Sequence, residues 1–96
     1  MIIEHALLRV REGQTKDFEA AMAQARPLIA ASAGFIDIDV RPACEEPNLY
    51  LLIVKWTDIA SHRDGFRRSD RYQEWRASLH HFYDPMPEVH YFGEAL

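Results

Sequence analysis

The segment from Leu49 to Trp56 most constrains the fold, because it reads as a strand with apolar side chains on both faces. Side chains alternate across a strand, so its two faces carry Tyr50, Leu52, Val54 and Trp56, and Leu49, Leu51, Ile53 and Lys55. A strand of this kind has to be covered on both sides.

A strand, a helix and a second strand are predicted before this segment. Ile2 to Arg11 is rich in Ile, Leu and Val, which is typical of a strand. Thr15 is expected to cap a helix, Pro27 to kink or break it, and Gly34 to be its C-cap. The helix has one apolar face, formed by Phe18, Met22, Ala25 and Ile29. Phe35 to Arg41 alternates as a half-exposed strand, with Ile36, Ile38 and Val40 on one face.

A helical region and a short strand are predicted after Trp56. The region runs from Ile59 to Phe82, with Asp58 as its cap and with Gly65 and Ser69 dividing it into two pieces. Ser69 can cap the second piece, and a last strand covers residues 89–92. The order β-α-β-β-α-β predicts one ferredoxin-like α+β domain over residues 1–96, with two helices on one face of a four-stranded antiparallel sheet.

Two helices can cover only one face of such a sheet, yet the strand from Leu49 to Trp56 is apolar on both faces, and the first strand carries Ile3 and Leu7 opposite Ala6, Leu8 and Val10. Leaving several hundred Å² of apolar surface in water would cost on the order of 10 kcal/mol. A second copy of the chain, packed sheet to sheet about a two-fold axis, is the expected cover. The sequence therefore predicts a homodimer formed through the open face of the sheet.

Composition excludes several classes of protein. Hydrophobic residues make up 48% of the 96 residues, which is typical of a folded domain. The net charge is −4 and there is no run of basic residues, so binding to nucleic acid is not expected. No apolar stretch approaches the roughly 20 residues that span a bilayer, and no membrane partner is expected. Cys44 is the single cysteine, which excludes an internal disulfide. With no signal-peptide pattern at the N-terminus, a cytoplasmic location is expected.

Several short motifs resemble those of the antibiotic biosynthesis monooxygenase (ABM) family over nearly the whole chain. They are Glu4-His5-Ala6-Leu7, Ala33-Gly34-Phe35, Val54-Lys55-Trp56 and the run His62-x-x-x-Phe66-x-x-Ser69-x-x-Tyr72. The resemblance implies a dimeric α+β barrel with a pocket between the helices and the sheet of each protomer. In characterised relatives a phenolic or quinol substrate is oxidised there by O₂ without metal or flavin, so no cofactor is expected.

The resemblance also suggests which positions form the site. Polyketide-oxidising relatives carry Asn-x-x-x-Trp-x-x-x-x-x-Tyr on the second helix, and the matching residues here are His62, Phe66 and Tyr72. Haem-degrading relatives use an Asn, a Trp and a His where this chain has His5, Phe66 and Arg76, which argues against haem degradation.

His5, His62 and Tyr72 are the candidate catalytic residues. His5 is either a general base at the pocket wall or a core histidine held by one hydrogen bond. His62 either replaces the substrate-binding Asn or lies on the surface. The Tyr72 hydroxyl could donate a hydrogen bond to a phenolate, although an aromatic stripe at helical spacing is also typical of a core.

Phe66, Trp75, Arg76 and His81 are the candidate substrate-binding residues, and the small substrate is expected to be aromatic. Arg76 could meet an anionic substrate or form a solvated ion pair. His81 follows His80 about 100° around a helix, so the two do not chelate, and no metal site is predicted.

Three functions remain open from the sequence. The first is a cofactor-independent monooxygenase that oxidises a small aromatic, phenolic or quinol substrate with O₂. The second is a non-catalytic barrel that binds a small hydrophobic molecule, which the substituted family positions favour. The third is a structural subunit that depends on another protein.

Overall fold

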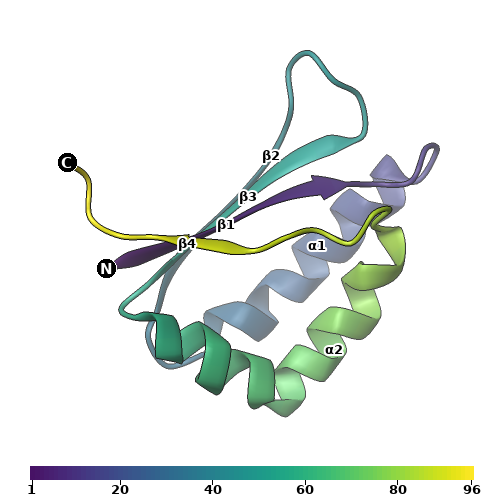
Figure 1. The fold of residues 1–96 in the computed structure, drawn as a ribbon. Helices are drawn as coiled ribbons and strands as arrows, with labels where there is room; N and C mark the ends of the chain where they lie inside the picture. Colours follow the sequence, from purple (N-terminus) through teal and green to yellow (C-terminus); the bar gives the residue numbers. More distant parts are fainter.

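The computed structural model describes all 96 residues as a four-stranded antiparallel sheet with two helices packed on one face (Figure 1). The elements in chain order are β1 (Ile2–Arg9), α1 (Thr15–Ala30), β2 (Phe35–Pro42), β3 (Leu49–Trp56), α2 (Asp70–Leu79) and β4 (His90–Phe92). The strands lie side by side in the order β2-β3-β1-β4. This is the ferredoxin-like βαββαβ arrangement, so the predicted fold class is confirmed.

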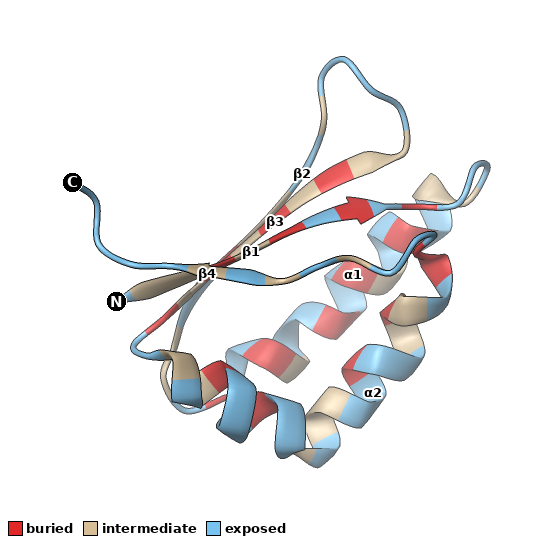
Figure 2. Cartoon of the chain, viewed as in Figure 1, coloured by how far each residue is buried: buried red, intermediate tan, exposed pale blue.

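The hydrophobic core lies between the sheet and the helices. The predicted apolar face of α1 is confirmed, because Phe18, Met22, Ala25 and Ile29 are all buried. They face the buried side chains of the two central strands, which include Ala6, Leu8, Leu52, Val54 and Trp56 (Figure 2). Each large apolar side chain buried in this way stabilises the fold by about 1.5–3 kcal/mol.

The ends of α1 differ from the predicted ones. Gln14 is the cap and its carbonyl accepts a hydrogen bond from the Phe18 N–H at 2.9 Å, so Thr15 is the first helical residue. Pro27 does not break the helix, which continues to Ala30. Because proline lacks an N–H, one helical hydrogen bond is missing at this position.

Gly34 is not the C-cap of α1 but lies in the turn that leads into β2. Its φ of +82° is in the left-handed region, which favours glycine. A Cβ atom there would also overlap the side chains of Ser61 and Thr57. The glycine therefore lets the turn pass close to the segment that follows β3.

A bulge near the start of β2 changes which side chains face the helices. The pairing with β3 shifts register between Phe35 and Asp37, so Phe35 lies opposite Trp56 and packs against the core. Ile36 is left 47% exposed, and its predicted place on the face of Ile38 and Val40 is wrong.

The helical region after β3 is divided as predicted. A π-helical turn covers Ser61–Gly65, a 3₁₀ turn covers Phe66–Arg68, and α2 follows. The Asp58 carboxylate accepts a hydrogen bond from the Ser61 N–H at 2.8 Å, and the Ser69 hydroxyl accepts one from the Tyr72 N–H at 3.2 Å. Both predicted caps are confirmed.

The other face of the sheet is covered by no helix of this chain (Figure 2). Leu7 in the central strand β1 is 45% exposed, and Phe92 in β4 is 53% exposed. Neither helix is long and apolar enough to cross a membrane.

Candidate functional site

A cavity of about 280 Å³ lies on the helix side of the sheet, between the central strands, α2 and the segment that leads to β4. Apolar side chains such as Ala6, Leu52 and Ile29 line part of it. The side chains that could bind or react with a ligand are Glu4, His62, Phe66, Arg67, Tyr72, Trp75, His80 and Tyr83. The cavity is therefore lined mostly by aliphatic and aromatic side chains, with a small number of polar groups, which is typical of a small-molecule site.

Two of the lining residues, Glu4 and His62, belong to a continuous polar chain. The Trp56 Nε1–H donates to Glu4 Oε1 at 2.9 Å, and His62 Nε2 lies 3.4 Å from the same oxygen. On the other side of the imidazole, His62 Nδ1 lies 2.6 Å from the Tyr91 hydroxyl. Glu4 and Tyr91 are direct partners across β1 and β4, so the sheet register holds both ends of the chain.

Burial sets the protonation states in this chain. It raises the pKa of Glu4, although the hydrogen bond from Trp56 and the charge of Arg67 oppose the rise. Burial, with a smaller effect of Arg67, lowers the pKa of His62 to about 4, so the imidazole is neutral at pH 7. A neutral imidazole has a single N–H; with that proton on Nε2, facing Glu4, Nδ1 accepts a hydrogen bond from the Tyr91 hydroxyl.

Aromatic rings fix the positions of the polar groups. The His62 ring lies 5.3 Å from the Trp56 ring, measured between centroids. Phe66 makes edge contacts with Tyr72 at 5.4 Å and with Trp75 at 5.8 Å. The Tyr72 hydroxyl makes no hydrogen bond within the chain, so it can donate to a ligand in the cavity.

The structure brings together four of the predicted site residues: His62, Phe66, Tyr72 and Trp75 all line the cavity. His62 and Phe66 are one turn apart and both point inward, as their spacing suggested. No three His, Cys, Asp or Glu side chains are grouped so that they could hold a metal ion.

Arg76 and His81 lie away from the cavity, contrary to the prediction. Trp75 points into the core, so Arg76, one residue later, is turned about 100° outward and is exposed. α2 ends at Leu79 and a 3₁₀ turn follows, which directs His80 to the cavity. His81 is exposed, with its ring 4.2 Å from that of Phe82.

His5 lies on the opposite face of the sheet from the cavity. Because Glu4 and Ala6 face the helices, the alternation of β1 turns His5 toward the open face. It pairs across the strands with His90 and makes an edge contact with the Phe92 ring at 5.8 Å. The expected position of His5 at the pocket wall is therefore corrected.

The sequence analysis missed Glu4, Arg67, His80, Tyr83 and Tyr91. Glu4 had a visible signal, because it is the only charged residue on a strand face that otherwise carries Ala6, Leu8 and Val10. The positions of His80, Tyr83 and Tyr91 depend on how the segment after Leu79 folds back over the sheet, and nothing in the local sequence pattern specifies that. Arg67 follows Phe66 in the 3₁₀ turn before α2.

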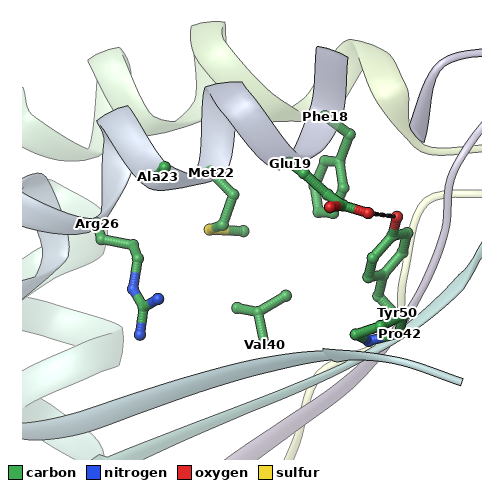
Figure 3. A pocket seen from close by; sticks show the side chains of 8 residues that line it. All are labelled: Phe18, Glu19, Met22, Ala23, Arg26, Val40, Pro42 and Tyr50. Carbon is green, nitrogen blue, oxygen red and sulfur yellow. Dashed lines mark hydrogen bonds between the residues drawn. The ribbon is translucent and has the colours of Figure 1, made fainter. Parts of the chain in front are cut away.

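A second cavity of about 190 Å³ lies between α1 and the β2 edge of the sheet (Figure 3). Met22 and Val40 face each other across it, and Glu19, Arg26 and Tyr50 are its polar lining residues. The Tyr50 hydroxyl donates to the Glu19 carboxylate, and Arg26 donates to the Ile38 carbonyl at 3.0 Å. These hydrogen bonds are internal and none of the predicted site residues is present, so the first cavity is the candidate site.

Comparisons with known proteins identify the family. The model for the antibiotic biosynthesis monooxygenase family matches residues 1–78. The chain is 44% identical over 95 residues to the uncharacterized protein YczJ of Bacillus subtilis (strain 168), covering 99% of this chain and all of that protein.

Solved structures agree with this assignment. A "putative antibiotic biosynthesis monooxygenase" from Bordetella bronchiseptica superposes with a TM-score of 0.93 at 36% identity, over 99% of this chain and 97% of that chain. SnoaB, a cofactor-independent oxygenase from Streptomyces nogalater, has the same fold with a TM-score of 0.86 at 19% identity, over 99% of this chain and 93% of that chain. This chain belongs to the antibiotic biosynthesis monooxygenase family.

Proposed function

We propose that this protein is a cofactor-independent monooxygenase that oxidises a small phenol or quinol with O₂. The observation that carries the proposal is the polar chain of Glu4, His62 and Tyr91, of which Glu4 and His62 line a cavity with mostly aliphatic and aromatic walls. A phenol needs a base to become electron-rich and a dry aromatic cage to react in, and the cavity contains both kinds of group. Membership of a monooxygenase family supports the same reaction class.

The proposed reaction uses the electrons of the substrate alone. The phenol loses its proton to the polar chain, and the Tyr72 hydroxyl donates a hydrogen bond to the phenolate oxygen. The phenolate passes one electron to O₂, and the phenoxyl radical and superoxide combine at a ring carbon that bears hydrogen. The resulting peroxide anion takes back the proton held by the polar chain, and the hydroperoxide so formed loses water to give a quinone. One O₂ is consumed, with one oxygen atom in the quinone and one in water, and no external reductant is required.

The volume of the cavity limits the size of the substrate. An apolar cavity of about 150 Å³ is sufficient to hold benzene. The 280 Å³ cavity therefore has room for one or two fused rings with small substituents. Phe66 and Trp75 are the proposed contacts for the ring faces and edges.

A homodimer through the open face of the sheet forms part of the proposal. The centre of this face is mostly apolar, with Ile3, Leu7, Leu51 and Ile53 in adjacent strands around His5. Charged residues lie around that centre, on the edge strand and at the strand ends: Arg9, Asp37, Asp39, Arg41 and Lys55. An apolar centre with a charged rim is the usual layout of a protein interface.

Sedimentation of two variants tests the dimer. We expect the wild type to sediment as a dimer and Leu7→Lys as a monomer, because a buried ammonium group would face the partner sheet. Ala30→Lys, on the exposed side of α1, is the matched control and should remain dimeric. A monomeric wild type at working concentration would contradict this part of the proposal.

Oxygen uptake tests the activity. The purified protein, freed of metals with a chelator, is mixed with one-ring and two-ring phenols and hydroquinones in an oxygen electrode. We expect uptake above the uncatalysed rate, with one O₂ consumed per quinone formed. Tyr72→Phe should lower kcat/KM about a hundredfold, as expected for loss of a donor to an oxyanion. Tyr50→Phe, in the second cavity, should retain the activity of the wild type.

The alternative function, a non-catalytic binding protein, predicts a different result. Both nitrogens of His62 already have partners within the chain, which would suit a rigid binding wall. A phenol that binds saturably to the wild type, with no O₂ uptake for any member of the panel, would establish this alternative and overturn the oxygenase.

A further inference from the structure

Glu4 is a buried carboxylate with only one of its two oxygens held by the protein. The side chain of this β1 residue is 6% exposed, and Oε1 receives both the Trp56 N–H and the contact with His62. Oε2 makes no hydrogen bond within the chain. No fully enclosed side-chain oxygen or nitrogen is left without a partner, so Oε2 reaches open space, and Glu4 lines the cavity.

His62 is poorly arranged to take a proton from a ligand. Its Nδ1 is engaged by the Tyr91 hydroxyl at 2.6 Å and its Nε2 faces Glu4 at 3.4 Å. Its ring also lies against Trp56, which prevents it from turning freely. To accept a proton from a substrate, the imidazole would have to give up one of these partners while buried.

We propose that Glu4 Oε2 is the atom that takes the proton from the substrate, and that the cavity therefore binds small phenols or enols in their neutral form. The inference rests on the proposed function and specifies the form of the substrate that binds. In this step the O–H bond of the phenol breaks and an O–H bond forms on the carboxylate. The electron pair stays on the phenolate oxygen. Trp56 and His62 are positioning residues that hold Oε1 and thereby aim Oε2 at the cavity.

The charges around Glu4 are consistent with a base of this kind. Burial raises the pKa of the carboxyl, which brings it closer to that of a phenol and makes the transfer easier. The positive charge of Arg67 acts in the opposite sense and favours the ionised form that can accept a proton. The other titratable groups around the carboxylate are His62, Tyr91 and, among the cavity lining, Tyr72, His80 and Tyr83.

Binding of 4-nitrophenol without oxygen tests the proposal separately from turnover. Its phenol and phenolate forms absorb at different wavelengths, so the dissociation constant and the form bound are measured together. A carboxylate that faces the hydroxyl excludes a phenolate. We therefore expect the apparent affinity of the wild type to fall about tenfold for each pH unit above the pKa of the free phenol.

Variants identify the group responsible. Glu4→Gln should lose this pH dependence, because a neutral amide can donate to the phenolate. Glu4→Asp keeps a carboxylate and should keep the dependence with weaker binding. Glu74→Gln, an exposed change outside the cavity, should match the wild type. His62→Asn should also keep the dependence, and a thermal melt of each variant confirms that it is folded.

Three results would overturn the proposal: equal binding of phenolate by the wild type, no saturable binding of the neutral phenol, or a pH dependence that His62→Asn removes and Glu4→Gln keeps. These results are distinct from failure of the proposed function. Absence of O₂ uptake would remove the oxygenase and leave the binding data in place, whereas loss of the pH dependence would remove only the role of Glu4.

Discussion

The Nδ1 atom of His62 lies 2.6 Å from the hydroxyl oxygen of Tyr91, which joins the helical turn after β3 to the short edge strand β4. β4 has three residues and pairs only with β1. The hydrogen bond therefore adds a side-chain tie between this edge strand and the helical layer. It also fixes the imidazole that contacts Glu4.

Tyr91→Phe should destabilise the protein. The change leaves the buried Nδ1 of His62 without a donor, which costs about 1–3 kcal/mol in the free energy of unfolding. Denaturant unfolding followed by tryptophan fluorescence measures this value. Tyr72→Phe is the matched control, since its hydroxyl has no partner in the chain, and it should change stability by less than about 0.5 kcal/mol. Equal effects of the two variants would contradict the hydrogen bond.

Acid should destabilise the fold through His62. The folded imidazole has a pKa of about 4 and the unfolded one about 6.5, so the unfolded state binds more protons between these values. The free energy of unfolding therefore falls as the pH is lowered from 6.5 to 4, by about 3 kcal/mol in total.

The raised pKa of Glu4 acts in the opposite sense, because above pH 4.5 the folded state holds that proton more tightly, and it offsets part of the loss. Unfolding measured at pH 7 and pH 4.5 should show a smaller loss for His62→Asn than for the wild type. An equal loss in both proteins would mean that His62 is not buried in its neutral form.

Arg67→Ala should move the pH profile of activity. The Arg67 charge lowers the pKa of Glu4, so its removal raises that pKa further. In a plot of kcat/KM for oxygen uptake against pH, the acid limb should shift to higher pH. The variant should therefore lose more activity at low pH than on the plateau at higher pH. Arg68→Ala removes a neighbouring guanidinium that does not line the cavity and should leave the limb in place.

The sequence predicted the fold and one wall of the site for the same reason, which is periodicity. The alternation in Leu49–Trp56 and the helical spacing of His62 and Phe66 are local patterns, and the structure follows them. The position of His5 could not be obtained in this way, because β1 is apolar on both faces and only the packed helices decide which face becomes the core. His80 was missed because α2 changes to a 3₁₀ turn there, which alters the direction of each later side chain.

Gly34→Ala should destabilise more than Gly13→Ala. Both glycines have a φ near +80°, and a left-handed conformation costs an alanine about 1–2 kcal/mol. A Cβ at Gly13 meets nothing, whereas one at Gly34 overlaps Ser61 and Thr57. Thermal melts should give a clearly lower Tm for Gly34→Ala. Equal Tm values would show that the turn can move away from Ser61 at no cost.

Histidine NMR during the addition of a phenol tests most directly whether the helix-side cavity is the binding site. The five histidines report on different places, and their ring signals are recorded in long-range ¹H–¹⁵N spectra of the wild type. His62 and His80 line the cavity, so their signals should move as 4-nitrophenol is added. His5 and His90 lie on the open face and His81 on the surface, so theirs should stay in place. Movement of His5 and His90 with His62 unchanged would put the ligand on the other side of the sheet and contradict this account.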